Sequence, residues 1–196
     1  MILPIVAYGD PILRKQGEPI GPDYPDLPVL IANMWDTMYQ AKGVGLAAPQ
    51  IGRAIRLFVI DASPFADDED LPEDQREVLR DFKQVFINAR IETESGLKWA
   101  FNEGCLSIPD IREDVNRMDT VTLTYQDEAF EQRTEVFGGL LARIIQHEYD
   151  HIEGILFTDR LSSLKKRLLK GKLTDISRGK IEVDYKMRFL AQKRGR

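Results

Sequence analysis

The sequence predicts an α+β fold in a single domain. Segments rich in β-branched and apolar residues outnumber the helical ones and follow one another along the chain, whereas a doubly wound sheet would alternate strand and helix. With 196 residues, of which 43% are hydrophobic and 30% charged, the chain can bury one substantial core. Internal repeats and Ser/Gly linkers are absent from the sequence, so we expect one domain.

The N-terminal half predicts one long helix and two strands. Apolar residues recur at three- and four-residue spacing over residues 27–41, which indicates an amphipathic helix that Gly43 closes. A short helical turn is expected after Asp10-Pro11, because aspartate caps a helix start and proline suits its first position. Residues 55–60 and 85–94 are apolar runs that predict strands.

An acidic stretch separates these two strands, from about residue 66 to residue 81. Its composition predicts an exposed, mobile insertion that carries no chemistry. Farther on, the alternating residues 121–125 predict another strand, and a turn leads to a partner strand that ends at Phe137.

The C-terminal third predicts two helices and a last strand. A glycine pair opens a helix over residues 139–152, which Gly154 is expected to end. A C-terminal helix is predicted from about Asp159 to Lys170, followed by a strand over residues 181–185. In that helix, the residues expected to face inward are Leu161, Leu164 and Leu168.

Positive charge is concentrated at the C-terminal end. Residues 164–196 contain 12 Lys or Arg against 3 Asp or Glu, although the whole chain has a net charge of -5. We therefore predict a main domain over residues 1–171 and a basic extension, residues 172–196, packed on it. The acidic body excludes a core that wraps nucleic acid. The basic end either docks on an anionic partner or is simply solvated.

The cellular compartment is predicted from what the sequence lacks. It has no stretch near the roughly 20 consecutive apolar residues of a membrane span, and its apolar N-terminus has no basic flank like that of a secretory signal. A single cysteine cannot form an internal disulfide. We therefore expect a protein of the reducing cytoplasm with no membrane partner.

The segment His147-Glu148-Tyr149-Asp150-His151 has the HExxH pattern of metal-dependent hydrolases. Residues four apart lie one above the other on a helix, so His147 and His151 can bind one metal ion. Glu148 lies about a third of a turn from His147, close enough to act on a water molecule without being a ligand. The two histidines are the only ones in the chain, which favours a metal site over chance spacing.

The third ligand is expected to be Cys105, the only cysteine of the chain. A lone cysteine is commonly a small buried apolar residue. Here, however, glycine and proline flank it within residues 103–109, and a catalytic metal site needs three protein ligands and one open position. One thiolate with two imidazoles meets that requirement.

A third segment, residues 43–50, combines small residues with Gln50 and is a weak signal alone. Taken with residues 103–109 and 146–154, however, it resembles the three signature motifs of the peptide deformylases, in the right order. The similarity extends from the first few residues to about Lys170. The acidic insertion is longer than in the shortest family members, and the basic tail is outside the resemblance.

The resemblance implies antiparallel β-sheets packed around the HExxH helix, followed by a C-terminal helix and the basic tail. It implies hydrolysis of the N-formyl group of nascent polypeptides that begin with formylmethionine, which releases formate and a free N-terminal methionine. One divalent metal ion per chain is implied, Fe(II) in the cell, with Zn(II) or another divalent ion as the alternative. Its ligands would be Cys105, His147 and His151.

Residue roles follow from the matching positions. A metal-bound water would attack the formyl carbon, with Glu148 as general acid/base and with Gln50 and the Leu106 N–H stabilising the oxyanion. Glu103 and Arg117 would form a structural ion pair behind the site. Substrate contacts are expected from Val44, Gly45, Arg112 and Ile144, the last lining an apolar pocket for the methionine side chain.

Two other classes stay open at this point. A zinc metallopeptidase shares HExxH, but its third ligand is normally a downstream Glu or His; no downstream histidine exists, Glu153 is too near and Glu182 lies in the basic tail. A non-catalytic module with a structural metal would need four protein ligands, and only three good candidates are present. Separately, the charge of residues 164–196 suggests that this segment brings the enzyme to the ribosome.

Overall fold

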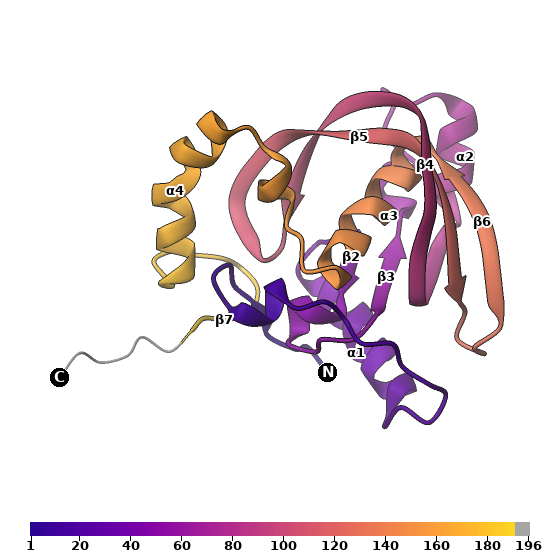
Figure 1. The fold of residues 1–196 in the computed structure, drawn as a ribbon, viewed down its shortest axis with the longest axis horizontal. Helices are drawn as coiled ribbons and strands as arrows, with labels where there is room; N and C mark the ends of the chain where they lie inside the picture. The colour runs from indigo at the N-terminus through magenta and orange to yellow at the C-terminus, as the bar shows by residue number, and fades with distance from the viewer. Residues whose placement is uncertain (191–196) are drawn as a thin grey trace.

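The computed structural model describes residues 1–190 and has the arrangement drawn in Figure 1. Its helices are η1 (Pro11–Arg14), α1 (Leu27–Gln40), η2 (Ala48–Ile51), η3 (Ser63–Phe65), α2 (Glu73–Arg80), α3 (Gly139–Ile152), η4 (Phe157–Arg160) and α4 (Ser163–Ser177). Its strands are β1 (Ile5–Val6), β2 (Gly45–Ala47), β3 (Leu57–Asp61), β4 (Lys83–Cys105), β5 (Ile108–Gln126), β6 (Gln132–Gly138) and β7 (Met187–Arg188).

Five strands form one antiparallel sheet in the order β2-β3-β4-β5-β6, which confirms the predicted α+β class. Strands β4 and β5 form a long hairpin that arches over α3 in Figure 1. The tip of this hairpin is the two-residue connection Leu106-Ser107, directly after Cys105. A second, two-stranded sheet pairs β1 with β7 in parallel, so only the main sheet is antiparallel.

The five-stranded sheet lies between α3 and α1, and the side chains of β3 contact both layers. Alternate side chains of a strand point to opposite faces. Phe58 and Ile60 join the apolar cluster that contains α3, whereas Leu57 and Val59 join the cluster that contains α1. All of β3 is buried, including Asp61 at its end, and its apolar residues 57–60 indicate this burial in the sequence.

Helix α3 is the central element that carries the HExxH segment. It begins and ends at the predicted residues, and its apolar side chains pack on the concave side of the sheet. Gly154 follows it with a φ of 74°, the left-handed conformation that commonly closes a helix. The ends of α3 therefore fall where the sequence pattern predicts them, and the packing of its apolar side chains places the helix in the core.

The prediction for the C-terminal helix is wrong in its extent and for two of its three inward residues; Leu161, which precedes the helix, is buried as predicted. Helix α4 begins after the Ser162 cap, passes through Gly171 and ends at Ser177, so the boundary predicted at residue 171 falls inside it. Leu164 and Leu168 are 63% and 72% exposed. The buried residues of α4 are instead Leu169, Leu173 and Ile176. The stretch offers two leucine stripes on different faces of the helix, and packing on the body of the protein buries the one on Leu169 and Leu173.

Three other segments differ from prediction. The acidic insertion is not wholly exposed, because it contains α2, whose Leu79 is buried against the α3 cluster. No strand forms at residues 181–185; the last strand of the described chain is β7, at Met187–Arg188. Strands β4 and β5 also extend well beyond the predicted residues 85–94 and 121–125. Among residues 1–190, no helix is long and apolar enough to cross a membrane.

Candidate metal centre and active site

Three candidate ligands converge where the end of β4 meets α3. The ligand atoms of Cys105, His147 and His151 all lie within 4.8 Å of one another. Cys105 Sγ is 3.3 Å from His151 Nε2, and the two imidazole centroids are 5.1 Å apart. The helical spacing brings the histidines together, and the long β4–β5 hairpin brings the cysteine to them.

The surroundings of these residues fit a bound cation. Glu103 Oε2 lies 2.9 Å from His147 Nδ1, which fixes the ring and leaves Nε2 for coordination. Burial, together with the charge of His147, holds the pKa of His151 well below its ordinary value. Burial also lowers the pKa of His147, but hydrogen bonds with Cys105 and Glu103 outweigh it and raise this pKa to about 10. A cation beside Cys105 would displace that proton and take over its role.

Glu148 lies beside this group and is buried, with 5% of its surface exposed. Its Oε2 has no hydrogen-bond partner among the described residues. Burial raises the pKa of Glu148 to about 7, partly offset by the charge of His147. A Cβ atom on Gly45 would overlap Glu148 Oε1, so this position of β2 accepts only glycine without moving the carboxylate. Such a carboxyl group can accept and release a proton near neutral pH.

Gln50 presents its amide nitrogen to the same point. Its Oε1 accepts a hydrogen bond of 2.8 Å from the Ala47 N–H, which fixes the amide orientation. Its Nε2 then lies 3.5 Å from Cys105 Sγ and 3.4 Å from Ser107 Oγ. Gln50 therefore offers a fixed N–H donor next to the three candidate ligands.

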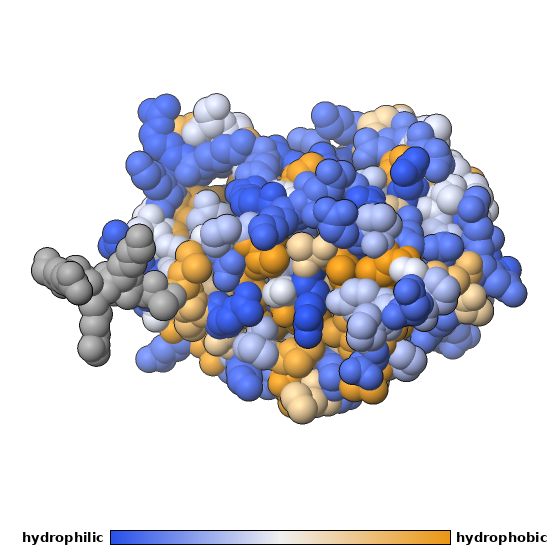
Figure 2. Space-filling view, turned by 60° about the horizontal axis from the view of Figure 1, so that its bottom comes forward, coloured by the Kyte–Doolittle hydropathy of each residue, from blue (hydrophilic) through white to orange (hydrophobic). Residues whose placement is uncertain are grey.

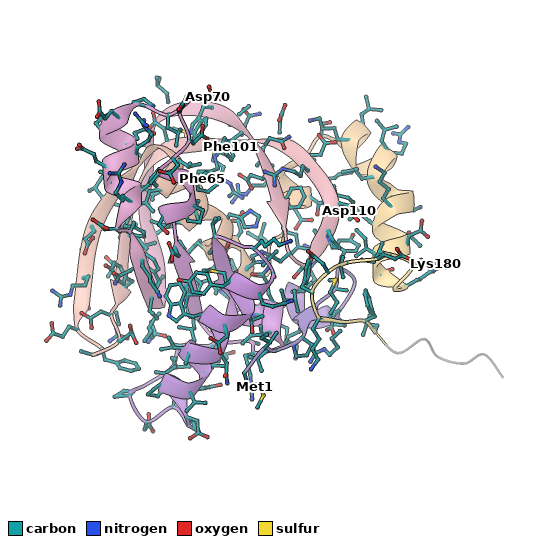
Figure 3. The ribbon with its side chains drawn as sticks, turned by 180° about the vertical axis from the view of Figure 1, so that it is seen from behind. Met1, Phe65, Asp70, Phe101, Asp110 and Lys180 are labelled. Carbon is teal, nitrogen blue, oxygen red and sulfur yellow. The ribbon has the colours of Figure 1, made fainter. Side chains whose placement is uncertain are left out.

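These groups open on a cavity of about 750 Å³. Nine of the ten predicted site residues line it; the tenth, His151, belongs to the ligand group but not to the lining. Sequence reasoning missed Phe65 and Phe101, which also line the cavity and lie near each other in Figure 3. Neither belongs to one of the three motifs, so no local pattern marks them. Figure 2 shows apolar side chains, in orange, exposed within a largely hydrophilic face of the molecule.

Buried charges support the site from behind. Arg117 donates to both oxygens of Glu103, at 2.7 and 3.0 Å, which confirms the predicted ion pair. The pair belongs to a larger network, because Arg117 also reaches Asp150 at 2.7 Å and Arg143 reaches Glu103 at 2.9 Å. Burial disfavours the Glu103 carboxylate, but hydrogen bonds from His147 and Arg117 outweigh it and lower the pKa of Glu103. Asp150 lies within the HExxH segment, yet nothing in the pattern marks its role.

An α+β scaffold in which Cys105, His147 and His151 converge beside the buried carboxylate of Glu148 defines the class of metal-dependent hydrolases. Comparison with known proteins narrows the class. The polypeptide deformylase family model matches residues 2–167. The chain belongs to the peptide deformylase family, whose members are metalloenzymes. The zinc metallopeptidase alternative is thereby set aside.

Relatives match along the full chain. Peptide deformylases from Flavobacterium johnsoniae and Christiangramia forsetii are 64% and 63% identical over 196 residues, which is 100% of this chain and of each relative. A crystal structure of a peptide deformylase from Legionella pneumophila has a TM-score of 0.77 and 38% identity, and the match covers 92% of this chain and 98% of that one. Fold and sequence thus agree on the family.

Proposed function

We propose that this enzyme removes the N-formyl group from N-formylmethionyl nascent peptides and releases formate and a free N-terminal methionine. The observation that carries the proposal is the buried Glu148 carboxylate beside Cys105, His147 and His151, in a cavity that Gln50 also lines. A formyl carbon bears only hydrogen, so a narrow site admits it and excludes bulkier acyl groups.

The residues that would hold the metal are Cys105, His147 and His151. When bound, a divalent ion supplies Lewis-acid chemistry, which lowers the pKa of water and stabilises negative charge on oxygen. We propose Fe(II) in the cell, with Zn(II) as the alternative. The thiolate supports a soft or redox-active ion, because sulfur donates more charge than imidazole or carboxylate.

Glu148 would act as the general acid/base. Its free Oε2 can take a proton from the attacking water and deliver it to the nitrogen of the departing amine. Gln50 Nε2 and the Leu106 backbone N–H would donate to the oxyanion that forms at the formyl oxygen. In this arrangement Glu148 transfers the proton, and Gln50 with the Leu106 N–H stabilises the negative charge that develops on the formyl oxygen.

The substrate backbone would add to the open edge of β2. This strand is the edge of the five-stranded sheet, and Val44 and Gly45 line the cavity there. An extended peptide can pair with such an edge through main-chain hydrogen bonds. Ile144 would line the methionine pocket, and we add Phe65 and Phe101 as further apolar walls. Arg112, held by Asn102 across the hairpin, would contact the peptide farther out.

The first prediction tests this assignment. Anaerobically purified protein is expected to contain about one divalent ion per chain and to hydrolyse a formyl-Met tripeptide, while leaving an unformylated internal peptide intact. The Cys105→Ser variant is expected to lose most of the metal and the activity, because the thiolate is one of three ligands. Cleavage of the unformylated peptide alone, or full metal and activity in Cys105→Ser, would refute the proposal.

We also propose that the enzyme is cytoplasmic, and that basic residues of the C-terminal segment help it to bind ribosomes. Support comes from α4, where Lys166, Arg167 and Lys170 are exposed and line a second cavity of about 450 Å³. Residues 191–196, which the same prediction included, lie outside the described residues. Phosphate contacts by such side chains release counterions and are salt-dependent.

The second prediction concerns these three side chains. Changing them together to Gln is expected to reduce co-sedimentation with ribosomes at low salt and to flatten its salt dependence, with formyl-peptide turnover unchanged. The control changes three exposed cations elsewhere to Gln, namely Lys15, Arg53 and Lys98. Equal loss of binding in both triple variants would show that only net charge matters and would refute the docking surface.

A further inference from the structure

The segment that follows α4 returns to the active site. Residues 182–185, here called the strap, line the same cavity as the three candidate metal-site motifs. In Figure 3 the pale yellow C-terminal segment passes beside Asp110, which also lines the cavity. The strap lies beyond the last residue matched by the family model, residue 167, and the sequence indicated no role for it in the active site.

The strap touches the reaction site through one side chain. The Tyr185 hydroxyl donates a hydrogen bond of 2.8 Å to the Leu106 carbonyl oxygen. The next carbonyl, that of Ser107, accepts a hydrogen bond of 2.8 Å from the Tyr8 N–H. The two-residue tip between β4 and β5 is therefore held from outside the hairpin at both of its carbonyl groups.

The strap is itself firmly anchored. Directly after it, the Lys186 and Arg188 carbonyls accept hydrogen bonds of 2.8 and 2.9 Å from the N–H groups of Ile5 and Ala7. Two other contacts of the strap are at the surface: Gln40 donates to the Asp184 carbonyl at 3.3 Å, and Lys42 forms an ion pair with Asp184 whose side chains are 79% and 68% exposed. Exposed pairs contribute little. The contact that can transmit position to the site is therefore that of Tyr185, which is partly buried against the α1 cluster.

We propose that Tyr185 is a positioning residue for the oxyanion site: its hydroxyl holds the Leu106–Ser107 peptide and thereby aims the Leu106 N–H. The inference rests on the proposed function, in which that N–H stabilises the oxyanion. The hairpin register is irregular between Gly104 and Cys105, just before the tip, so the strand ladder alone does not fix this peptide. Small displacements of a donor are costly, because catalysis depends on its alignment with the developing charge.

The third prediction tests the tether with Tyr185→Phe, which keeps the ring and removes only the hydroxyl. We expect kcat for a formyl-Met tripeptide to fall about tenfold, less than the 10²–10³ typical of deleting an oxyanion donor, because the N–H remains but is misaimed. KM and metal content are expected to stay within about twofold. The Ser107 amide, which shares a peptide plane with the Leu106 carbonyl, is expected to exchange with deuterium at least about tenfold faster.

The matched control is Tyr24→Phe, because Tyr24 packs against the same α1 cluster but has no role in the site. It is expected to leave kcat and Ser107 exchange unchanged. Unchanged exchange in Tyr185→Phe, or a lower melting temperature with kcat within twofold of wild type, would overturn the positioning role. If wild-type protein does not act on formyl peptides, the proposed function fails, while the exchange measurement still decides whether the tether exists.

Discussion

Replacing Glu148 by Gln is expected to lower kcat for deformylation by a factor of about 10²–10⁴ while metal content stays unchanged. The two side chains have nearly the same shape, so the cavity and the ligand group should be preserved. Gln cannot take a proton from the attacking water or return it to the leaving nitrogen. The burial that raises the pKa of Glu148 to about 7 suits the native carboxyl group to both steps near neutral pH.

The measurement is a kcat and KM determination on a formyl-Met tripeptide, with metal counted in the same samples. Glu92→Gln is the control, because Glu92 is an exposed carboxylate on β4 away from the cavity. It should behave as wild type. Glu148→Ala should lose at least as much turnover as Glu148→Gln. Wild-type turnover in Glu148→Ala with metal still bound would show that the base is another group.

Local sequence patterns predict a helix well where the capping residues and the apolar periodicity indicate the same limits. Helix α3 has a glycine at each end, so its limits follow from sequence, and it is buried on nearly all sides, so no choice between faces arises. Helix α4 has no such agreement. Its stretch contains two leucine stripes, and the one on Leu169 and Leu173 is buried while the one on Leu164 and Leu168 is exposed. Tertiary packing decided between them.

The site was predictable to the extent that its residues lie close in sequence. Four-residue spacing alone places His147 and His151 on one helix face. That Cys105 meets them depends on a 23-residue strand bending back across α3, and no local pattern specifies such a contact. The strap shows the same limit, because Tyr185 and Leu106 are 79 positions apart. The resemblance to peptide deformylases predicted that Cys105 meets the two histidines, but it did not predict the contact between Tyr185 and Leu106.

Replacing Arg117 by Met is expected to reduce the free energy of unfolding by about 3–5 kcal/mol. Arg117 is buried and donates to two buried carboxylates, those of Glu103 and Asp150. Met fills similar space but leaves both carboxylates short of a partner inside the protein. Breaking a buried pair costs far more than the pair contributes net, because the desolvated charges that are left lose part of their compensation. Arg143 still contacts Glu103 and Arg160 still contacts Asp150, but neither replaces the guanidinium that joined the two carboxylates.

Urea unfolding of metal-free protein isolates this effect from metal binding. Arg133→Met is the matched control, since Arg133 also contacts two carboxylates, Asp127 and Glu131, but its side chain is 47% exposed. The Arg133→Met substitution is expected to lower the free energy of unfolding by less than about 1 kcal/mol. Arg117→Lys should fall between the two, because lysine keeps the charge but cannot donate to both carboxylates as a planar fork.

The same network of buried charges explains why replacing Arg117 should also weaken metal binding. Glu103 accepts from Arg117 with both oxygens and from His147 with one, so it links the buried arginine to a candidate ligand. Without Arg117, only Arg143 still holds the Glu103 carboxylate on that side, so the carboxylate turns more easily and fixes the imidazole less firmly. We therefore expect Arg117→Met to bind metal more weakly, by about 10–100-fold, in a competition with a chelator. An equal loss of unfolding free energy in Arg117→Met and Arg133→Met would contradict the predicted cost of breaking the buried pair. Unchanged metal affinity in Arg117→Met would show that the buried charges do not support the metal ligands.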